Sequence, residues 1–165
     1  GTLNGFVSYA LSRTRREFDR FENGQAFAPK YDRLHDLTAV LRYDFAEDWR
    51  ATAVFTYATG QAYTEPSGYY KLVDDPTLSR PRDVLQSDYN ASRLPAYHRL
   101  DLGVRRKGDF FGIGTYEARM QLVNAYGRRN IWFVIFEPTQ GNTIERNVVP
   151  QIPVPLPNVS LTVNF

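Results

Sequence analysis

The stretch Asn158-Val159-Ser160-Leu161-Thr162-Val163-Asn164-Phe165 decides the fold. Polar and apolar residues alternate along it without exception. Side chains of a β-strand point to opposite faces with a period of two, so this stretch predicts a strand with one apolar and one polar face. The strand ends on an aromatic residue. Its apolar face carries Val159, Leu161, Val163 and Phe165.

The same alternation occurs five times upstream, which predicts five further strands. The predicted strands cover residues 3–13, 34–45, 49–59, 97–107 and 114–125. A tight polar turn is predicted at residues 46–48, and a second short turn begins at residue 108. The other connections are longer and richer in charge and proline, so they are predicted as loops. These loops cover residues 13–30, 60–94 and 137–157. Residues 131–136 are predicted to continue the fifth strand.

Composition sets limits on the class of protein. The chain has 165 residues, the length of one domain. It has no cysteine, which excludes disulfide frameworks, thiolate metal sites and cysteine catalysis. The net charge is +2 with both signs interspersed, so no nucleic-acid tract is indicated, and the short basic run at residues 13–16 is interpreted as a solvated loop. There is no leader peptide or initiator Met, so we expect a mature piece or a fragment.

Long and short connections alternate along the chain, which is typical of bacterial outer-membrane barrels with long extracellular loops and short periplasmic turns. No apolar stretch reaches the ~20 residues of a transmembrane helix, but strands of ~9–11 residues fit a tilted crossing of the hydrocarbon. The predicted fold class is all-β, an antiparallel transmembrane β-barrel segment of about six strands. Aromatic residues favour membrane–water boundaries. The predicted girdles are Phe45, Trp49, Phe110, Phe111 and Phe165 on the periplasmic side, and Tyr9, Tyr57, Tyr97, Tyr126 and Trp132 on the outer side.

The alternation also assigns charged residues to the inside of the predicted barrel. A charge on the lipid face costs about 2–4 kcal/mol at the bilayer midplane, so the charged positions belong on the lumen side. A polar wall in contact with water or a plug and a path for solutes are both compatible with this pattern. The predicted lumen-facing residues are Arg42, Arg50, Arg105, Glu117 and Arg119.

Several segments, in order along nearly the whole chain, resemble the carboxyl-terminal barrel of TonB-dependent outer-membrane receptors. These segments are residues 8–13, 31–35, 57–64, 93–102, 122–130 and the terminal strand. The resemblance implies a barrel of about 22 strands with a plugged lumen. It also implies that the plug and the earlier strands lie outside this chain.

The family resemblance implies uptake of a scarce nutrient across the outer membrane, with a siderophore, vitamin, carbohydrate or peptide as cargo. The implied partners are the lipid bilayer of the outer membrane, the remaining barrel strands and plug, the TonB complex and the barrel-assembly machinery, which would read the terminal strand. No nucleic acid is expected as a partner. Cargo is not predicted, because function lives in sites grafted onto a fold.

The loop at residues 60–94 is the candidate for ligand capture or gating, because clusters of aromatic and arginine side chains suit recognition surfaces. A carbohydrate, a peptide or an anionic chelate would fit such a cluster, and a solvated loop packed over the barrel mouth is the plainer interpretation. The candidate ligand residues are Tyr63, Tyr69, Tyr70, Arg80, Arg82, Tyr89 and Arg93.

No catalytic residue, metal ligand or cofactor site is predicted, and the chain is not expected to be an enzyme. His35 lies near Asp32 and Asp36, and His98 lies near Asp101, but neither set has a third or fourth ligand at diagnostic spacing. Hydrogen bonding at the strand ends is the expected role of both histidines. Serines are present, but no ordered Ser-His-acid triad is visible.

Two other interpretations stay open at this point. The first is a non-transport outer-membrane barrel, such as an adhesin or a structural component of a surface complex. The second is a soluble antiparallel sandwich that binds carbohydrate, which would need its apolar faces packed against each other.

Overall fold

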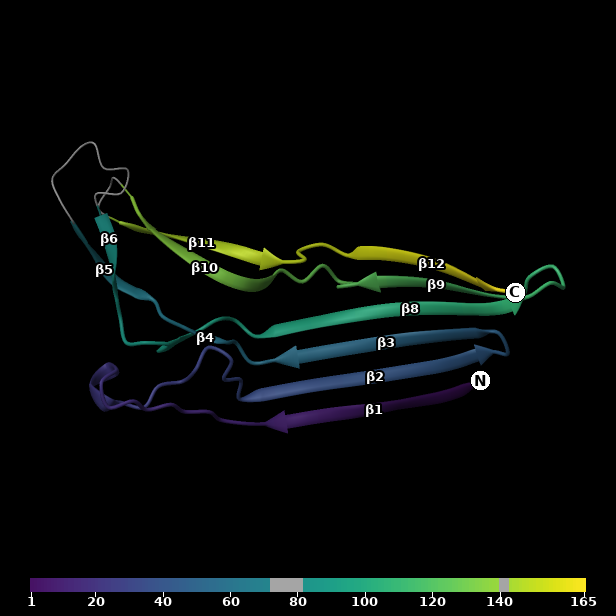
Figure 1. Ribbon diagram of the computed structural model, residues 1–165, viewed down its shortest axis with the longest axis horizontal. Helices are drawn as coiled ribbons and strands as arrows, with labels where there is room; N and C mark the ends of the chain where they lie inside the picture. The colour runs from purple at the N-terminus through teal and green to yellow at the C-terminus, as the bar shows by residue number, and fades with distance from the viewer. Residues whose placement is uncertain (72–81, 140–142) are drawn as a thin grey trace.

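A six-stranded antiparallel sheet forms the body of the protein (Figure 1). The computed structural model describes residues 1–71, 82–139 and 143–165, and for residues 69–71 and 82–84 it describes the backbone alone. The sheet confirms the predicted all-β, antiparallel class, and β1 and β12 are its two edges. In spatial order its strands are β1 (Thr2–Leu11), β2 (His35–Ala46), β3 (Trp49–Ala58), β8 (Tyr97–Asp109), β9 (Thr115–Val123) and β12 (Leu156–Asn164).

The six predicted strands are confirmed to within a few residues at each end. The connection between β2 and β3 and the one between β8 and β9 are short, as predicted, and lie at one end of the sheet together with the carboxyl terminus (Figure 1). In the second of these turns, the Phe110 N–H donates to Gly114 O at 2.9 Å. We call this end of the sheet the turn end, and the opposite end the loop end.

Two of the three predicted loops are wrong. Residues 60–94 contain the paired strands β4 (Ala62–Tyr63) and β7 (Ser92–Arg93), and the hairpin strands β5 (Pro66–Lys71) and β6 (Arg82–Gln86). Residues 130–151 form a hairpin of β10 (Asn130–Pro138) and β11 (Ile144–Gln151). Backbone donors and acceptors in a long connection need partners, and these segments pair with themselves. Their prolines and charges conceal the alternation that a longer strand would show.

Asn124 separates the sheet from the β10–β11 hairpin, so residues 131–136 do not continue the fifth strand as predicted. β9 ends at Val123, and Asn124 adopts a left-handed backbone conformation with a φ of 55°. Its buried side-chain amide donates to Arg128 O at 3.0 Å and to Ile152 O at 2.8 Å, and its side-chain oxygen accepts from the Arg128 N–H. Asparagine tolerates this conformation better than most residues, which explains the change of direction here.

The register gives the sheet one apolar and one polar face. Cross-strand neighbours on the first face are apolar from edge to edge, as in the row Leu3, Tyr43, Ala51, Val104, Met120 and Val159. No second layer covers this face among the described residues. Val159 is 73% exposed. Four described hydrophobic residues are buried, and all lie near the loop end: Ala28, Ala58, Ala62 and Leu94.

No described helix has the length and apolar character needed to cross a bilayer. The described helical structure is a single 3-10 turn, η1 (Glu22–Gly24).

Gly60 marks a close backbone approach at the loop end. A Cβ atom at this position would lie 1.5 Å from the carbonyl oxygen of Leu94, and this oxygen belongs to backbone that the Leu94 N–H bond to Gln61 O holds in place. We therefore expect Gly60→Ala to lower the free energy of unfolding by about 3 kcal/mol or more. Chemical unfolding of the purified protein measures this change.

Gly68→Ala is the matched control, because a Cβ atom there meets nothing within 4 Å. Equal stability of the two variants would contradict the close approach at Gly60.

Candidate functional site

The apolar face is bounded by aromatic contacts at both ends of the sheet. At the turn end, the ring centroids of Phe45 and Trp49 are 5.9 Å apart, and those of Phe110 and Phe165 are 6.0 Å apart. The guanidinium of Arg106 lies 5.3 Å from the Trp49 ring. Phe111 also contacts Phe110. The predicted periplasmic girdle residues thus form two contact groups at the turn end, Phe45 with Trp49, and Phe110 with Phe111 and Phe165.

At the loop end, two histidine–tyrosine pairs flank the same face. Tyr9 Oη lies 2.8 Å from His35 Nδ1, and Tyr126 Oη lies 2.7 Å from His98 Nδ1. Of the predicted outer girdle, Tyr97 differs from the expectation. It alternates with His98 and therefore lies on the polar face, where the guanidinium of Arg33 is 5.8 Å from its ring.

Each candidate histidine is therefore paired with a tyrosine hydroxyl. The acid that accompanies His35 in sequence, Asp32, is bonded elsewhere, to Arg93. Within residues 1–71, 82–139 and 143–165, no three His, Asp or Glu side chains gather as a metal site would require.

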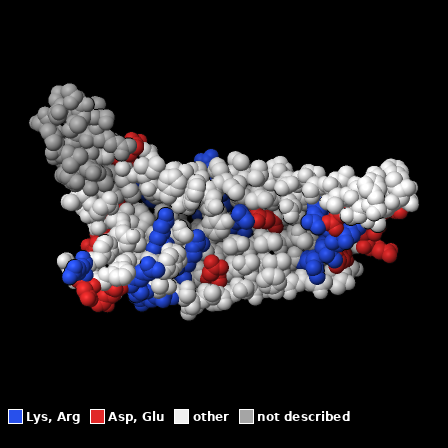
Figure 2. All heavy atoms as spheres, in the orientation of Figure 1, with Lys and Arg blue, Asp and Glu red and all other residues white. Residues whose placement is uncertain are grey.

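The predicted lumen-facing residues all lie on the polar face. Arg50, Arg105 and Arg119 stand directly opposite one another on β3, β8 and β9, and Arg42 shares this face opposite Thr52. Like charges in adjacent cross-strand positions repel, so this row needs anions nearby. Figure 2 shows basic and acidic side chains gathered in two groups, one toward the turn end and one at the loop end.

Two carboxylates partly neutralise the arginine row. Glu117 forms ion pairs with Arg119, with Lys107 at 3.4 Å and with Arg105 at 3.6 Å. Asp44 accepts two hydrogen bonds from the guanidinium of Arg50. The result is a partly shielded ionic network with an excess of positive charge, suited to contact with water or with an anionic surface.

An ion pair with a buried carboxylate ties the segments at the loop end together. We call residues 12–34, 59–71 and 82–96 the loop cluster. The carboxylate of Asp32 is 3% exposed, pairs with the Arg93 guanidinium and accepts the Thr14 N–H at 2.6 Å. The hydrogen bond from Arg93 holds the pKa of Asp32 below its usual value, against the opposing effect of burial.

Asn90 makes a second connection within the loop cluster. Its buried amide donates to Ala28 O at 2.8 Å, and its backbone N–H donates to Thr64 Oγ1 at 3.0 Å. These bonds and the Asp32–Arg93 pair fix the first loop against the segment that carries β4 and β7.

Between these connections lies an open depression of about 530 Å³, which we call the aromatic pocket. Three of its rings meet edge to face: Phe21, Phe27 and Tyr89, with centroids 5.1–5.2 Å apart. Two cationic side chains, Arg16 and Lys30, also line it. The other ring residues in its lining are Phe18, Pro29 and Tyr31.

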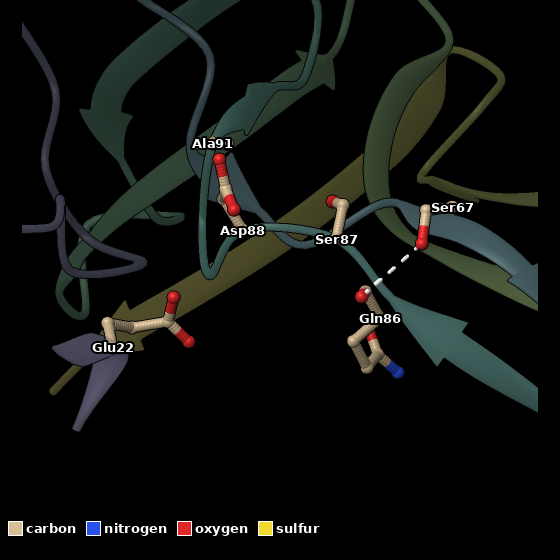
Figure 3. A pocket seen from close by; sticks show the side chains of 6 residues that line it. All are labelled: Glu22, Ser67, Gln86, Ser87, Asp88 and Ala91. Atoms are coloured by element: carbon tan, nitrogen blue, oxygen red, sulfur yellow. Dashed lines mark hydrogen bonds between the residues drawn. The ribbon is translucent and has the colours of Figure 1, made fainter. Parts of the chain in front are cut away.

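A second depression of about 600 Å³ lies in the loop cluster and is polar (Figure 3). Glu22 reaches it from η1, Ser67 from β5, and Ser87 and Asp88 from the segment after β6. Ser67 Oγ bonds to the carbonyl oxygen of Gln86 at 3.4 Å. Two carboxylates at its rim disfavour anionic ligands.

The predicted ligand residues have different surroundings. Tyr89 lines the aromatic pocket, Tyr63 stacks on Phe136 with centroids 6.2 Å apart, and Arg93 forms the ion pair with Asp32. The side chains of Tyr69, Tyr70 and Arg82, and all of Arg80, lie outside the described residues.

Sequence reasoning missed the residues that the first loop contributes to the aromatic pocket. The basic run that contains Arg16 was interpreted as solvated, and Phe18, Phe21 and Phe27 have neither strand nor helix spacing. Their density was the available signal, since three phenylalanines occur within ten residues of a charged loop.

No protein-family model, curated protein or solved structure matches the chain. What is shown is therefore the class, an all-β protein built on an open antiparallel sheet.

Proposed function

We propose that this chain forms part of the wall and the outer loops of a bacterial outer-membrane β-barrel that takes up a scarce nutrient, as TonB-dependent receptors do. The observation that carries the proposal is the continuous apolar face of the six-stranded sheet, which no described residue covers. It runs across β1, β2, β3, β8, β9 and β12.

Lipid is the environment that such a face fits. Transfer of one Leu-sized or Val-sized side chain out of water contributes about 1.5–3 kcal/mol. The exposed residues of this size on the apolar face include Val7, Leu41, Leu102, Val104, Val159 and Leu161. The strands are 9 to 13 residues long, enough to cross the hydrocarbon when tilted. Aromatic contacts at both ends of the face agree with two interfacial girdles.

The sheet edges and the polar face indicate the partners. Unpaired edge groups of β1 and β12 in hydrocarbon would cost several kcal/mol each, so further strands of a larger barrel pair with them in this proposal. The ionic network around Glu117 then faces the lumen, which a plug occupies. Coupling to TonB, and reading of Val159, Leu161, Val163 and Phe165 by the assembly machinery, follow from the family resemblance alone.

Intact mass and peptide mapping of the polypeptide that carries this sequence, taken from purified outer membranes, test the proposal. We expect the protein in the outer-membrane fraction, a mass several times 19.0 kDa and peptides from an upstream plug. Recovery from the soluble fraction would overturn the proposal. A membrane-bound chain whose full sequence has no plug would overturn the transport function and favour an adhesin or a structural barrel instead.

A further inference from the structure

We propose that the aromatic pocket binds a small ligand that joins an aromatic ring to an anionic group, of the aryl carboxylate class. As the ligand class of a receptor, this inference rests on the function proposed above. Binding itself rests only on the pocket.

The pocket walls offer flat apolar surfaces that are only partly used within the protein. Phe21, Phe27 and Tyr89 pack edge to face against one another, but Phe21 remains 40% exposed and Tyr89 41% exposed. Phe18, next to Phe27 at a centroid distance of 6.0 Å, is 52% exposed. Exposed aromatic side chains gathered in one depression favour a ligand that packs against rings, since such pairs contribute beyond the area they bury.

Backbone hydrogen bonds hold these walls in place before any ligand arrives. Arg16 and Phe27 exchange two bonds of 2.9 Å, which closes the first loop on itself, and the Phe21 N–H donates to Phe18 O at 3.0 Å. The Asn90 bond to Ala28 O anchors this loop to the segment that carries Tyr89. A preorganised site spends less binding free energy on ordering its own side chains.

The charges in the lining select an anion. Arg16 and Lys30 are the charged residues of the aromatic pocket, and no carboxylate lines it. Arg16 uses one nitrogen to donate to Tyr31 Oη at 2.7 Å, which orients the guanidinium and leaves other donors available. No hydrogen bond or ion pair to the Lys30 ammonium occurs among the described residues. An arginine and a lysine that line the same pocket suit a carboxylate, with the guanidinium able to bind both oxygens.

The size of the pocket limits the ligand. About 530 Å³ falls within the range of ~300–1,000 Å³ that holds small molecules. One or two fused rings with a single anionic group therefore match the walls and the cations together. A neutral sugar would use the rings but leave both cations without a partner.

Fluorescence anisotropy of 2-naphthoate with the purified full polypeptide in detergent micelles tests the inference, and neutral 2-naphthamide serves as the comparison probe. We expect 2-naphthoate to bind more tightly than the amide. Arg16→Gln and Lys30→Gln should each raise the Kd of 2-naphthoate about fivefold to tenfold and leave that of the amide unchanged. The two backbone bonds between Arg16 and Phe27 do not involve the Arg16 side chain, so we expect Arg16→Gln to preserve the loop.

Arg20→Gln is the charge-matched control in the same loop, because Arg20 does not line the pocket. It should leave both Kd values unchanged. Tyr89→Ala should weaken both probes, since it removes a wall. Equal affinity for the two probes, or equal effects of Lys30→Gln and Arg20→Gln, would overturn the inference, and displacement of 2-naphthoate by maltose alone would assign the pocket to carbohydrate.

The two proposals fail separately. A protein found outside the membrane that still binds 2-naphthoate refutes the receptor function and keeps the site. An outer-membrane protein with a plug that does not discriminate between the probes refutes only the ligand class.

Discussion

Met120→Arg is expected to prevent stable insertion of the protein into the outer membrane. Met120 lies in the middle of β9 on the apolar face, is 57% exposed and stands opposite Val104 and Val159. If this face meets lipid, an arginine at this depth costs about 2–4 kcal/mol, a large part of the stability of a single domain. The measurement is the amount of folded protein in the outer-membrane fraction, recognised by the change of its electrophoretic mobility when the sample is heated.

Gln121→Arg is the matched control, one residue further along the same strand. Gln121 lies on the polar face opposite Gly103 and Asn158, so in the proposed barrel an arginine there reaches a wet lumen. We expect near wild-type amounts of this variant. If the two variants accumulate equally, or if Gln121→Arg fails and Met120→Arg inserts, the assignment of the faces is wrong.

Arg93→Ala is expected to open the loop cluster while the sheet stays intact. The variant leaves the carboxylate of Asp32, which is 3% exposed, with only the Thr14 N–H as a described hydrogen-bond partner. Removal of one partner from a fully buried pair costs about 3–5 kcal/mol, and we expect about 2–3 kcal/mol here because the Arg93 side chain is 40% exposed. Hydrogen exchange of the amides of residues 12–34 measures the opening.

The ion pair also gives a pH dependence with a defined sign. The pKa of Asp32 is lowered in the folded protein, so the stabilising effect is complete above the ordinary carboxyl pKa and is lost as the pH falls through the lower folded value. Protection of the first loop should therefore decrease below about pH 4 in the wild type. Asp32→Asn should show no such decrease.

Arg129→Ala controls for loss of an arginine, because Arg129 is exposed and has no described ion pair. If its exchange pattern matches that of Arg93→Ala, the pair does not hold the loop cluster.

The strands of the sheet could be predicted because alternation is a local property of the sequence. The face on which a residue such as Leu161 or Thr162 lies follows from whether its position in the strand is odd or even. The register of β9 with β12 agrees with this parity. The same parity assigned the arginine row to one face. Parity alone could not predict that Glu117 pairs with three cations, because two of them, Arg105 and Lys107, belong to the neighbouring strand β8.

The loop cluster was less predictable, because its contacts join distant residues. Asp32 and Arg93 are 61 positions apart, and no periodicity relates them. Tyr89 was recognised as a candidate by its type, whereas its neighbours Phe21 and Phe27 come from a different loop. Residues 131–136 are predicted only as a continuation of the fifth strand, and β11 is missed because its charged residues and Pro150 conceal the alternation.

The interruption at Asn124 has a consequence for how this protein can change over evolutionary time. Insertion of a single residue into a strand exchanges the faces of every side chain beyond it. Residues 124–129 and 152–155 are not strand, so such an exchange within β10 or β11 ends before it reaches β9 or β12. The β10–β11 hairpin is therefore free to gain, lose or replace residues, while each side chain of the six-stranded sheet stays on its own face.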